Sequence, residues 1–209
     1  MLDRIGYEVE FWLLDKKAQI VMPNDYGFPI DEFGFLVEIR THAHRNCESL
    51  LDELNRLTLA HKAQAKSLGL RLVLQPRRFM GKSLINCLSI KYHWDTLPDL
   101  TANIYSTVSR SHATGIDSEY GTAGVHIHFS RHNRKGHRVQ LPLKRIVMGM
   151  DARFNEKIAY SGRVHGEYEI KPYGFEYRSL PSTVNPKVIV PFVFFLMEEE
   201  TKSLNNASD

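Results

Sequence analysis

The sequence predicts a single α+β domain, and three observations support this. Several segments alternate apolar and ionic residues with a period of two, which is typical of strands with one buried face. Two longer segments carry apolar residues at three- and four-residue steps, the spacing of an amphipathic helix. No repeat or Gly-, Ser- or Pro-rich linker divides the chain, so we expect one domain over residues 1–209, with a core over about 5–200.

The expected strands are identified by this alternation. In the first, Tyr7, Val9 and Phe11 alternate with Glu8 and Glu10, so one face is apolar and the other ionic. In chain order, the expected strands cover residues 5–14, 18–22, 35–41, 70–74 (buried), 86–92, 125–130 and 174–180. Loops or irregular structure are expected at 23–27, 115–124, 163–171 and over the rest of 76–100.

The expected helices are identified by their apolar stripes and end signals. Asn46 is a suitable N-cap for the first long helix, and Gly69 is placed to end it. Pro142 suits the first turn of the second. The expected helices cover residues 48–68, 101–111, 142–160 and a mostly apolar segment from 186, with a disordered tail at 203–209.

Composition excludes several classes of protein. With 43% hydrophobic and 24% charged residues, the chain is neither disordered nor fibrous. The longest apolar run, residues 188–197, is too short for a membrane span and contains Pro191. The first residues show no basic-then-apolar pattern, so we expect no secretory leader, and Cys47 and Cys87 form no metal-binding or redox motif. We therefore expect a cytoplasmic protein without a membrane partner.

The charge distribution favours no particular macromolecular partner. The formal net charge is +3, but residues 131–138 carry four positive charges and two histidines. Such a segment could contact phosphate. It has no aromatic residue and contains Gly136, so we interpret it as a solvated connection and expect no nucleic-acid partner.

Four expected strands share a feature that points to chemistry: each places two ionisable side chains at positions i and i+2, on one face. The pairs are Glu8 and Glu10, Glu38 and Arg40, His126 and His128, and Glu176 and Arg178. In one sheet, so many carboxylates would repel one another unless cations neutralised them, as divalent ions with oxygen ligands do. Arginine suits phosphate or carboxylate. A sheet with one solvated face is the alternative.

The same residues lie in motifs that resemble those of glutamine synthetase and the carboxylate–amine ligase superfamily. One further run is similar to the small phage-encoded amidoligases of that superfamily. The resemblance spans residues 5–186 and rests on about 35 positions. The motifs are Gly6–Phe11, Gly124–Ser130, Phe175–Arg178 and Asn185–Pro186, and the amidoligase-like run is Lys171–Ser182.

The resemblance implies a curved, mainly antiparallel sheet that forms a half-barrel or funnel, with helices packed on its outer face. ATP would enter one end, and a carboxylate and an amine substrate would meet at the other. The implied activity is that of an ATP- and Mg²⁺- (or Mn²⁺-) dependent ligase, which activates the carboxylate as an acyl phosphate. A phage-encoded ligase would act in the cytoplasm of the host cell.

The resemblance also implies metal ligands. Glu8, His126 and Glu176 resemble the ligands of the ion that holds the ATP phosphates. Glu10 and Glu38 resemble ligands of a second ion nearer the substrate carboxylate, and Glu38 is also an expected catalytic residue. Because like charges would be crowded here, replacing Glu8 with alanine could raise the stability of the metal-free protein.

The remaining expected site residues would contact phosphate or substrate. Arg178 resembles the catalytic arginine that faces the transferred phosphate, and His128 resembles a phosphate-side histidine. Arg40 and Arg163 are expected substrate or phosphate contacts, and Asp31 could be a further acidic ligand.

The sequence also departs from the family pattern. The sequence begins almost at the first expected catalytic strand, so we expect no counterpart of the extra N-terminal domain that completes the active sites of glutamine synthetase, and its ring assembly is not implied. Glu167 and Glu169 introduce acids where amidoligases often carry an arginine. Two alternatives stay open: a metal-dependent hydrolase using the same face, and a non-catalytic phage accessory protein that binds a partner.

Overall fold

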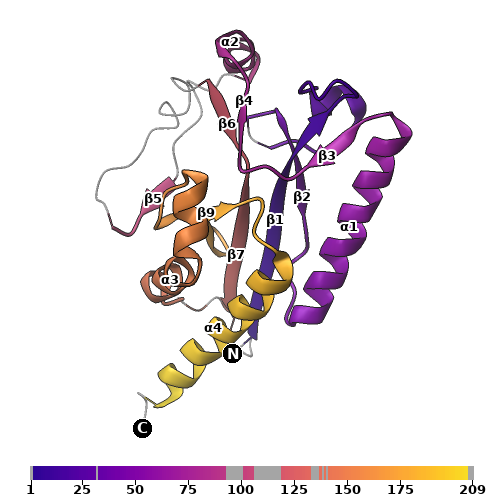
Figure 1. The fold of residues 1–209 in the computed structure, drawn as a ribbon. Coiled ribbons are helices and arrows are strands. Elements are labelled where there is room, and N and C mark those ends of the chain that lie inside the picture. Colours follow the sequence, from indigo (N-terminus) through magenta and orange to yellow (C-terminus); the bar gives the residue numbers. More distant parts are fainter. Residues whose placement is uncertain are drawn as a thin grey trace.

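The computed structural model describes residues 2–31, 33–92, 101–105, 119–132, 137, 139 and 141–206. They form an α+β structure around an open, seven-stranded sheet in the order β2-β1-β7-β9-β8-β5, with β3 paired to β1 (Figure 1). All of these strand pairs are antiparallel. The strands are β1 (Leu2–Leu14), β2 (Leu36–Arg40), β3 (Arg71–Val73), β5 (Thr101–Asn103), β7 (Gly124–His132), β8 (Glu167–Lys171) and β9 (Gly174–Pro181).

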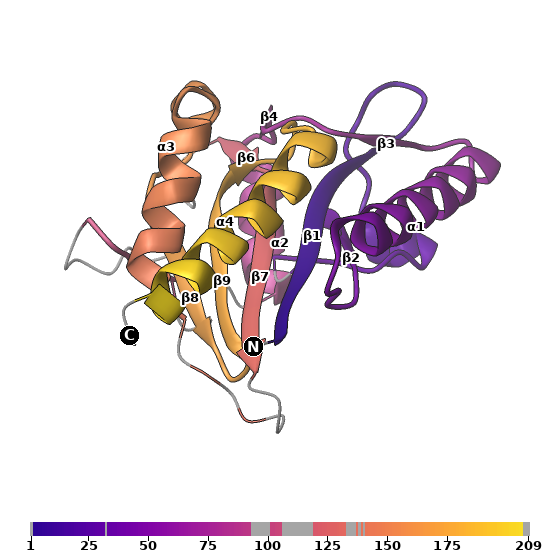
Figure 2. The same cartoon turned by 90° about the horizontal axis from the view of Figure 1, so that it is seen from below.

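Three long helices cover one face of the sheet (Figures 1 and 2). They pack against every second side chain of the central strands, including Tyr7, Ile127 and Tyr177, all at most 1% exposed. The Tyr177 hydroxyl donates to Asp151 at 2.6 Å, which fixes β9 to the second of these helices. The three helices are α1 (Cys47–Ser67), α3 (Leu143–Ser161) and α4 (Pro186–Asn206).

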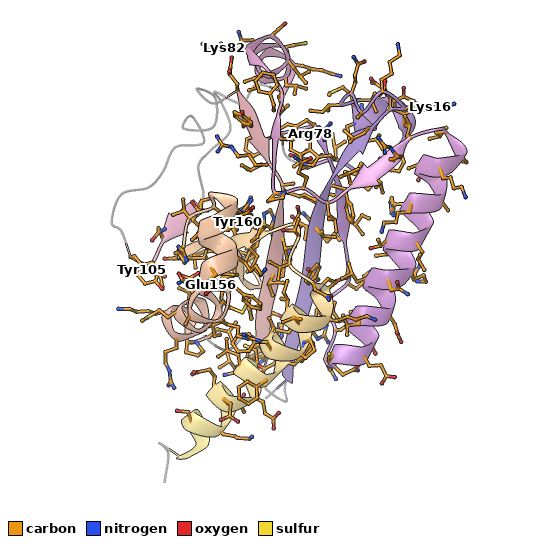
Figure 3. All side chains as sticks on the ribbon, viewed as in Figure 1. Lys16, Arg78, Lys82, Tyr105, Glu156 and Tyr160 are labelled. Atoms are coloured by element: carbon orange, nitrogen blue, oxygen red, sulfur yellow. The ribbon has the colours of Figure 1, made fainter. Side chains whose placement is uncertain are left out.

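A second, smaller apolar cluster covers one end of the opposite face. There Trp12 of β1 and Leu36 of β2 pack against Leu88 of α2 (Lys82–Tyr92). The short sheet of β4 (Arg77–Phe79) and β6 (Tyr120–Thr122) lies beside this cluster. Arg78 donates to the carbonyl of Ala18 in the turn after β1, which also carries Lys16 (Figure 3). The rest of this face is left for the ionic side chains.

The strongest sequence patterns are confirmed. The strands expected at 5–14, 35–41, 125–130 and 174–180 correspond to β1, β2, β7 and β9, and the two amphipathic helices correspond to α1 and α3. Asn46 caps α1 by accepting from the amide of Ser49 at 2.8 Å. Gly69 follows the helix with a φ of +72°, a left-handed conformation that favours glycine.

Several weaker expectations are wrong. The strand expected at 86–92 belongs to α2, because Ile85 and Leu88 are buried at a helical three-residue step. The first residues of the helix expected at 101–111 form β5, which gains its hydrogen bonds from β8; residues 106–111 lie outside the described part. Residues 18–22 do not form a strand: Ile20 makes an isolated bridge with Leu14, and the amide of Val21 donates to the carbonyl of Leu13. β3 is partly exposed rather than buried.

Other boundaries also differ from the expectations. The loop expected at 163–171 contains β8, and the loop expected at 115–124 contains β6. Residues 23–27 include the 3₁₀ helix η1 (Pro23–Tyr26). The tail expected to be disordered from residue 203 is helical to Asn206, while 207–209 lie outside the described part. No helix in the described part is both long and apolar enough to cross a membrane.

The basic segment at 131–138 is not wholly a solvated connection. Arg131 continues β7, is fully buried, and donates to the Asp3 carboxylate from Nε and from Nη2 at 2.9 Å. Its Nη2 also donates to Thr201 of α4 at 2.7 Å, so the start of β1 lies against that helix (Figure 1). Residues 133–136 and 138 lie outside the described part.

This ion pair between buried Arg131 and partly buried Asp3 gives a prediction about stability. Replacing Arg131 with methionine should lower the free energy of unfolding by about 3 kcal/mol, the lower end of the effect of breaking a buried pair, because the Asp3 carboxylate is 20% exposed when it loses its charged partner. Urea unfolding followed by circular dichroism measures the change. Arg56→Met is the control, since Arg56 is exposed and its 3.7 Å pair with Glu53 is worth under about 1 kcal/mol. Equal effects of the two substitutions would contradict the prediction.

Candidate metal centre

Strand pairing brings the four ionic pairs together on the face opposite α1, α3 and α4. The order β2-β1-β7-β9 makes the four strands that carry them direct neighbours. Their alternate residues, such as Tyr7 and Ile127, point into the helix-covered core, so the ionic residues share the other face. The cross-strand partners are Glu8 with Arg40 and His126, Glu10 with Glu38, and His128 with Glu176.

Glu8 lies at the centre of this group and is only 3% exposed. Its carboxylate is 2.6 Å from Nε of Arg40, 2.7 Å from Nδ1 of His126 and 3.2 Å from Nε2 of His128. Burial alone would raise the pKa of Glu8, but the hydrogen bonds to both histidines and the charges of His126 and Arg40 outweigh it and lower the pKa. Glu8 is therefore an anion that accepts from three neighbours.

Glu176 is the second buried anion, at 2% exposed. Its carboxylate is 2.6 Å from Nη1 of Arg178, 3.1 Å from Nζ of Lys171 and 3.2 Å from Nδ1 of His126. Burial opposes ionisation, but the nearby His126 and Arg178 lower the pKa of Glu176 below its ordinary value. His126 thus bridges the two anions through one nitrogen.

Glu8, His128 and Glu176 form a group that could hold a metal ion. Each offers one ligand atom, and these atoms all lie within 4.8 Å of one another. Two carboxylate oxygens and one imidazole nitrogen suit Mn²⁺, and Mg²⁺ binds through the carboxylates with water completing its shell. The donor set therefore fits a divalent cation. His128, expected as a phosphate-side residue, takes the place in this group that the resemblance gave to His126.

Glu10 and Glu38 lie beside this group without joining it. Glu10 accepts from the Gly124 amide and lies 3.9 Å from Nε2 of His126, while Glu38 is 2.7 Å from Nη2 of Arg40. Burial and then the negative charge of Glu8 raise the pKa of Glu38 to about 9. A bound cation would favour the ionised form of Glu38. A second metal ion at Glu10 and Glu38 stays a prediction.

Asp31 and its neighbours shape the turn before β2. Its carboxylate accepts from the amides of Phe33 and Leu36, at 3.3 and 2.9 Å. Burial and the charge of Glu10 raise the pKa of Asp31 to about 8. The described contacts of Asp31 are therefore those of a turn residue, and its role as a further metal ligand stays a prediction.

Arg163 contacts the backbone of the site strands. Its Nη2 donates to the carbonyl of Arg178, and a Cβ on Gly124 would lie 2.6 Å from its Nη1. A glycine at 124 thus lets the guanidinium pass beneath β7, whose first amide donates to Glu10. This arrangement supports the strands, and the expected contact of Arg163 with substrate or phosphate stays a prediction.

Three site residues were not identified from the sequence. Lys171 places Nζ between carboxylate oxygens of Glu169 and Glu176, at 2.5 and 3.1 Å, and the Tyr173 hydroxyl reaches Nδ1 of His128. Glu169 also pairs with Arg178 at 3.2 Å. The signal was present: acidic or basic residues alternate with Tyr168 and Ile170 along β8, as on the other site strands.

Comparison with known proteins does not assign this arrangement to a family. No protein-family model matches the chain, and no curated protein matches its sequence. The resemblance to the carboxylate–amine ligases therefore rests on the ordered motifs alone. The function has to be argued from the chemistry of the site.

Proposed function

We propose that the protein is an ATP- and Mg²⁺-dependent ligase that joins a carboxylate to an amine. The observation that carries the proposal is the convergence of Glu8, His128 and Glu176 within 4.8 Å, with Arg40, Lys171 and Arg178 pairing with the surrounding carboxylates. Ligand atoms for a divalent cation and basic groups suited to phosphate are thus present on one face. The order of the motifs supports the glutamine synthetase-like funnel as the finer description of the open sheet.

The proposed reaction has two steps. A substrate carboxylate oxygen attacks the γ-phosphorus of ATP, the bond to the β-phosphate oxygen breaks, and ADP leaves. The amine nitrogen then attacks the acyl carbon, the bond to the phosphate oxygen breaks, and phosphate leaves as the amide forms. An ionised carboxylate of the site takes the proton that the ammonium loses before attack.

The residues of the chain have distinct roles in this scheme. Glu8, His128 and Glu176 would hold the cation, which when bound neutralises phosphate charge. Arg178 would face the transferred phosphoryl group, where its planar guanidinium can donate two parallel hydrogen bonds. Arg40, which is 60% exposed at its side chain, can turn from the carboxylates towards substrate.

The number of basic groups distinguishes this proposal from a metal-dependent hydrolase. Activating a water molecule needs a cation and a base. The three basic side chains that pair with the carboxylates of Glu8 and Glu176 have no evident part in that reaction. An ATP-dependent ligase must neutralise a triphosphate, and these groups suit that task. The ordered ionic contacts also argue against a non-catalytic accessory protein, which would have no need for them.

Incubating the purified protein with ATP, Mg²⁺ and a pool of cell metabolites tests the proposal. Mass spectrometry should reveal ATP-dependent products lighter by one water than the sum of two precursors, with one ADP released per product. Glu8→Gln, which keeps the shape of the side chain, should form none. Substrate turnover that persists without ATP would support the hydrolase instead and contradict the ligase.

A further inference from the structure

The turn between β8 and β9 is held tightly against β7, next to the candidate metal centre. Gly174 pairs with Ser130, and a Cβ on Gly174 would overlap the carbonyl oxygen of Phe129. Only glycine allows so close an approach at this position. Tyr173, the last residue of the turn, is thereby placed beside His128, one residue before Phe129.

The Tyr173 hydroxyl contacts His128 of the candidate metal centre. The oxygen lies 2.5 Å from Nδ1 of His128, and the two ring centroids are 5.9 Å apart. The other ring nitrogen, Nε2, lies 3.2 Å from Glu8.

We propose that Tyr173 is a positioning residue that occupies Nδ1 of His128 and so leaves Nε2 as the nitrogen that binds the metal; this rests on the proposed metal centre. Histidines that bind metals usually have their other ring nitrogen hydrogen-bonded, which fixes the ring and its tautomer. Here the partner is a hydroxyl rather than the more usual carboxylate or carbonyl.

A hydroxyl can serve both states of His128, because it donates or accepts. Without metal, the Tyr173 hydroxyl donates to Nδ1, and the hydrogen on Nε2 is donated to Glu8. With a cation at Nε2, the ring hydrogen lies on Nδ1, and the Tyr173 oxygen accepts it. A carboxylate or carbonyl could fill only the second role. The phenol can therefore form a hydrogen bond with Nδ1 both when the ring hydrogen is on Nε2 and when it is on Nδ1.

Tyr173→Phe tests this role because it removes the hydroxyl and keeps the ring. Titration with Mn²⁺ alone, followed by electron paramagnetic resonance, should show an affinity about 10- to 100-fold weaker than that of the wild type. Tyr160→Phe is the matched control, since Tyr160 is 93% exposed on α3 and should leave the affinity unchanged (Figure 3).

A second measurement, on the metal-free protein, separates positioning from a general structural effect. In ¹⁵N-histidine-labelled protein, with the His128 signals assigned by their loss in His128→Gln, the wild type should show hydrogen on Nε2 and a hydrogen-bonded Nδ1. In Tyr173→Phe, the Nδ1 shift should move to that of an unbonded nitrogen. The ¹⁵N signals of the other histidines should stay in place.

The outcomes distinguish this proposal from the proposed function. If wild type and Tyr173→Phe bind Mn²⁺ with equal affinity and show the same His128 tautomer and shifts, the role of Tyr173 is overturned while the metal centre stands. If the wild type binds no Mn²⁺ at millimolar concentration, the metal centre is overturned, and the role of Tyr173 with it.

Discussion

Replacing Glu8 with alanine is expected to remove the thermal stabilisation that Mn²⁺ or Mg²⁺ with a nucleotide gives to the wild-type protein. A ligand that binds only the native state stabilises it by mass action, by about 2.7 kcal/mol at 100 times its Kd. Glu8 supplies one of three convergent ligand atoms and also orients His128, at 3.2 Å. Losing it should weaken metal binding more than about 100-fold, beyond the usual effect of an outer partner.

Differential scanning calorimetry with and without ligand measures this effect. Glu53→Ala is the matched control, because Glu53 also bonds two histidines, His42 and His44, but lies on α1 outside the convergent group. It should keep the full ligand-induced shift in melting temperature. A wild-type shift in Glu8→Ala would remove Glu8 from the metal centre.

The same substitution should lower the stability of the metal-free protein, contrary to what the sequence suggested. The clustered acids led us to expect that removing Glu8 would relieve repulsion. The contacts with Arg40, His126 and His128 instead lower the pKa of Glu8, so its charged form stabilises the native state. A carboxylate with a lowered native-state pKa contributes stability above its ordinary pKa of about 4.5, and this is lost as pH falls below that value. At pH 7 we expect a loss of about 2 kcal/mol.

Strands with a strict alternation could be predicted because burial of one face determines which residues point outward. In β1, β2, β7 and β9 this also determined which ionic residues share a face. The alternation could not show which ionic residues contact one another, because that depends on the register between strands. His128 joins the convergent group because the register pairs it with Glu176, and a register shifted by one residue would not.

The elements that failed depend on contacts distant in the sequence. Thr101–Asn103 forms a strand because the edge of β8 supplies its hydrogen-bond partners, and no local pattern contains that information. The helix α2 is short, and its buried Ile85 and Leu88 pack in one cluster with Trp12 of β1, which lies far away in the sequence. Arg131 looked like a surface charge because its partner, Asp3, is 128 residues away. In each case tertiary contacts outweighed local propensity.

β8 is a different kind of failure, since its alternation was visible. We expected a loop at 163–171, and we interpreted the acidic residues at 167 and 169 only as a departure from the family pattern. The alternation of Glu169 and Lys171 with Tyr168 and Ile170 would have placed both on the ionic face. A physical pattern in the chain was therefore more informative here than the resemblance.

Arg178→Lys is expected to reduce kcat by about 100-fold or more while changing the KM for ATP much less. Removing one hydrogen-bond donor that stabilises the charge developing in the transition state typically lowers the rate by this factor. Because such a donor contributes little to binding the ground state, its loss lowers kcat rather than raising KM. Lysine keeps the positive charge but lacks the planar fork, so it cannot donate two parallel hydrogen bonds to a phosphoryl group. ADP release, measured with substrates found in the metabolite experiment, gives both constants.

The alternative is that Arg178 only neutralises the acids. Its Nη1 is shared between Glu169 at 3.2 Å and Glu176 at 2.6 Å, and these anions raise its pKa against the opposing effect of burial. In that role, lysine would pair with one carboxylate, stability in urea would fall slightly, and turnover would be almost unchanged. Arg145→Lys, at a 3.1 Å pair with Glu200 remote from the metal centre, is the matched control.

One Nη1 atom already bonds both carboxylates, so Nε and Nη2 do not take part in these two pairs and can donate to a phosphoryl group. Wild-type turnover in correctly folded Arg178→Lys would mean that this donation is not used in catalysis.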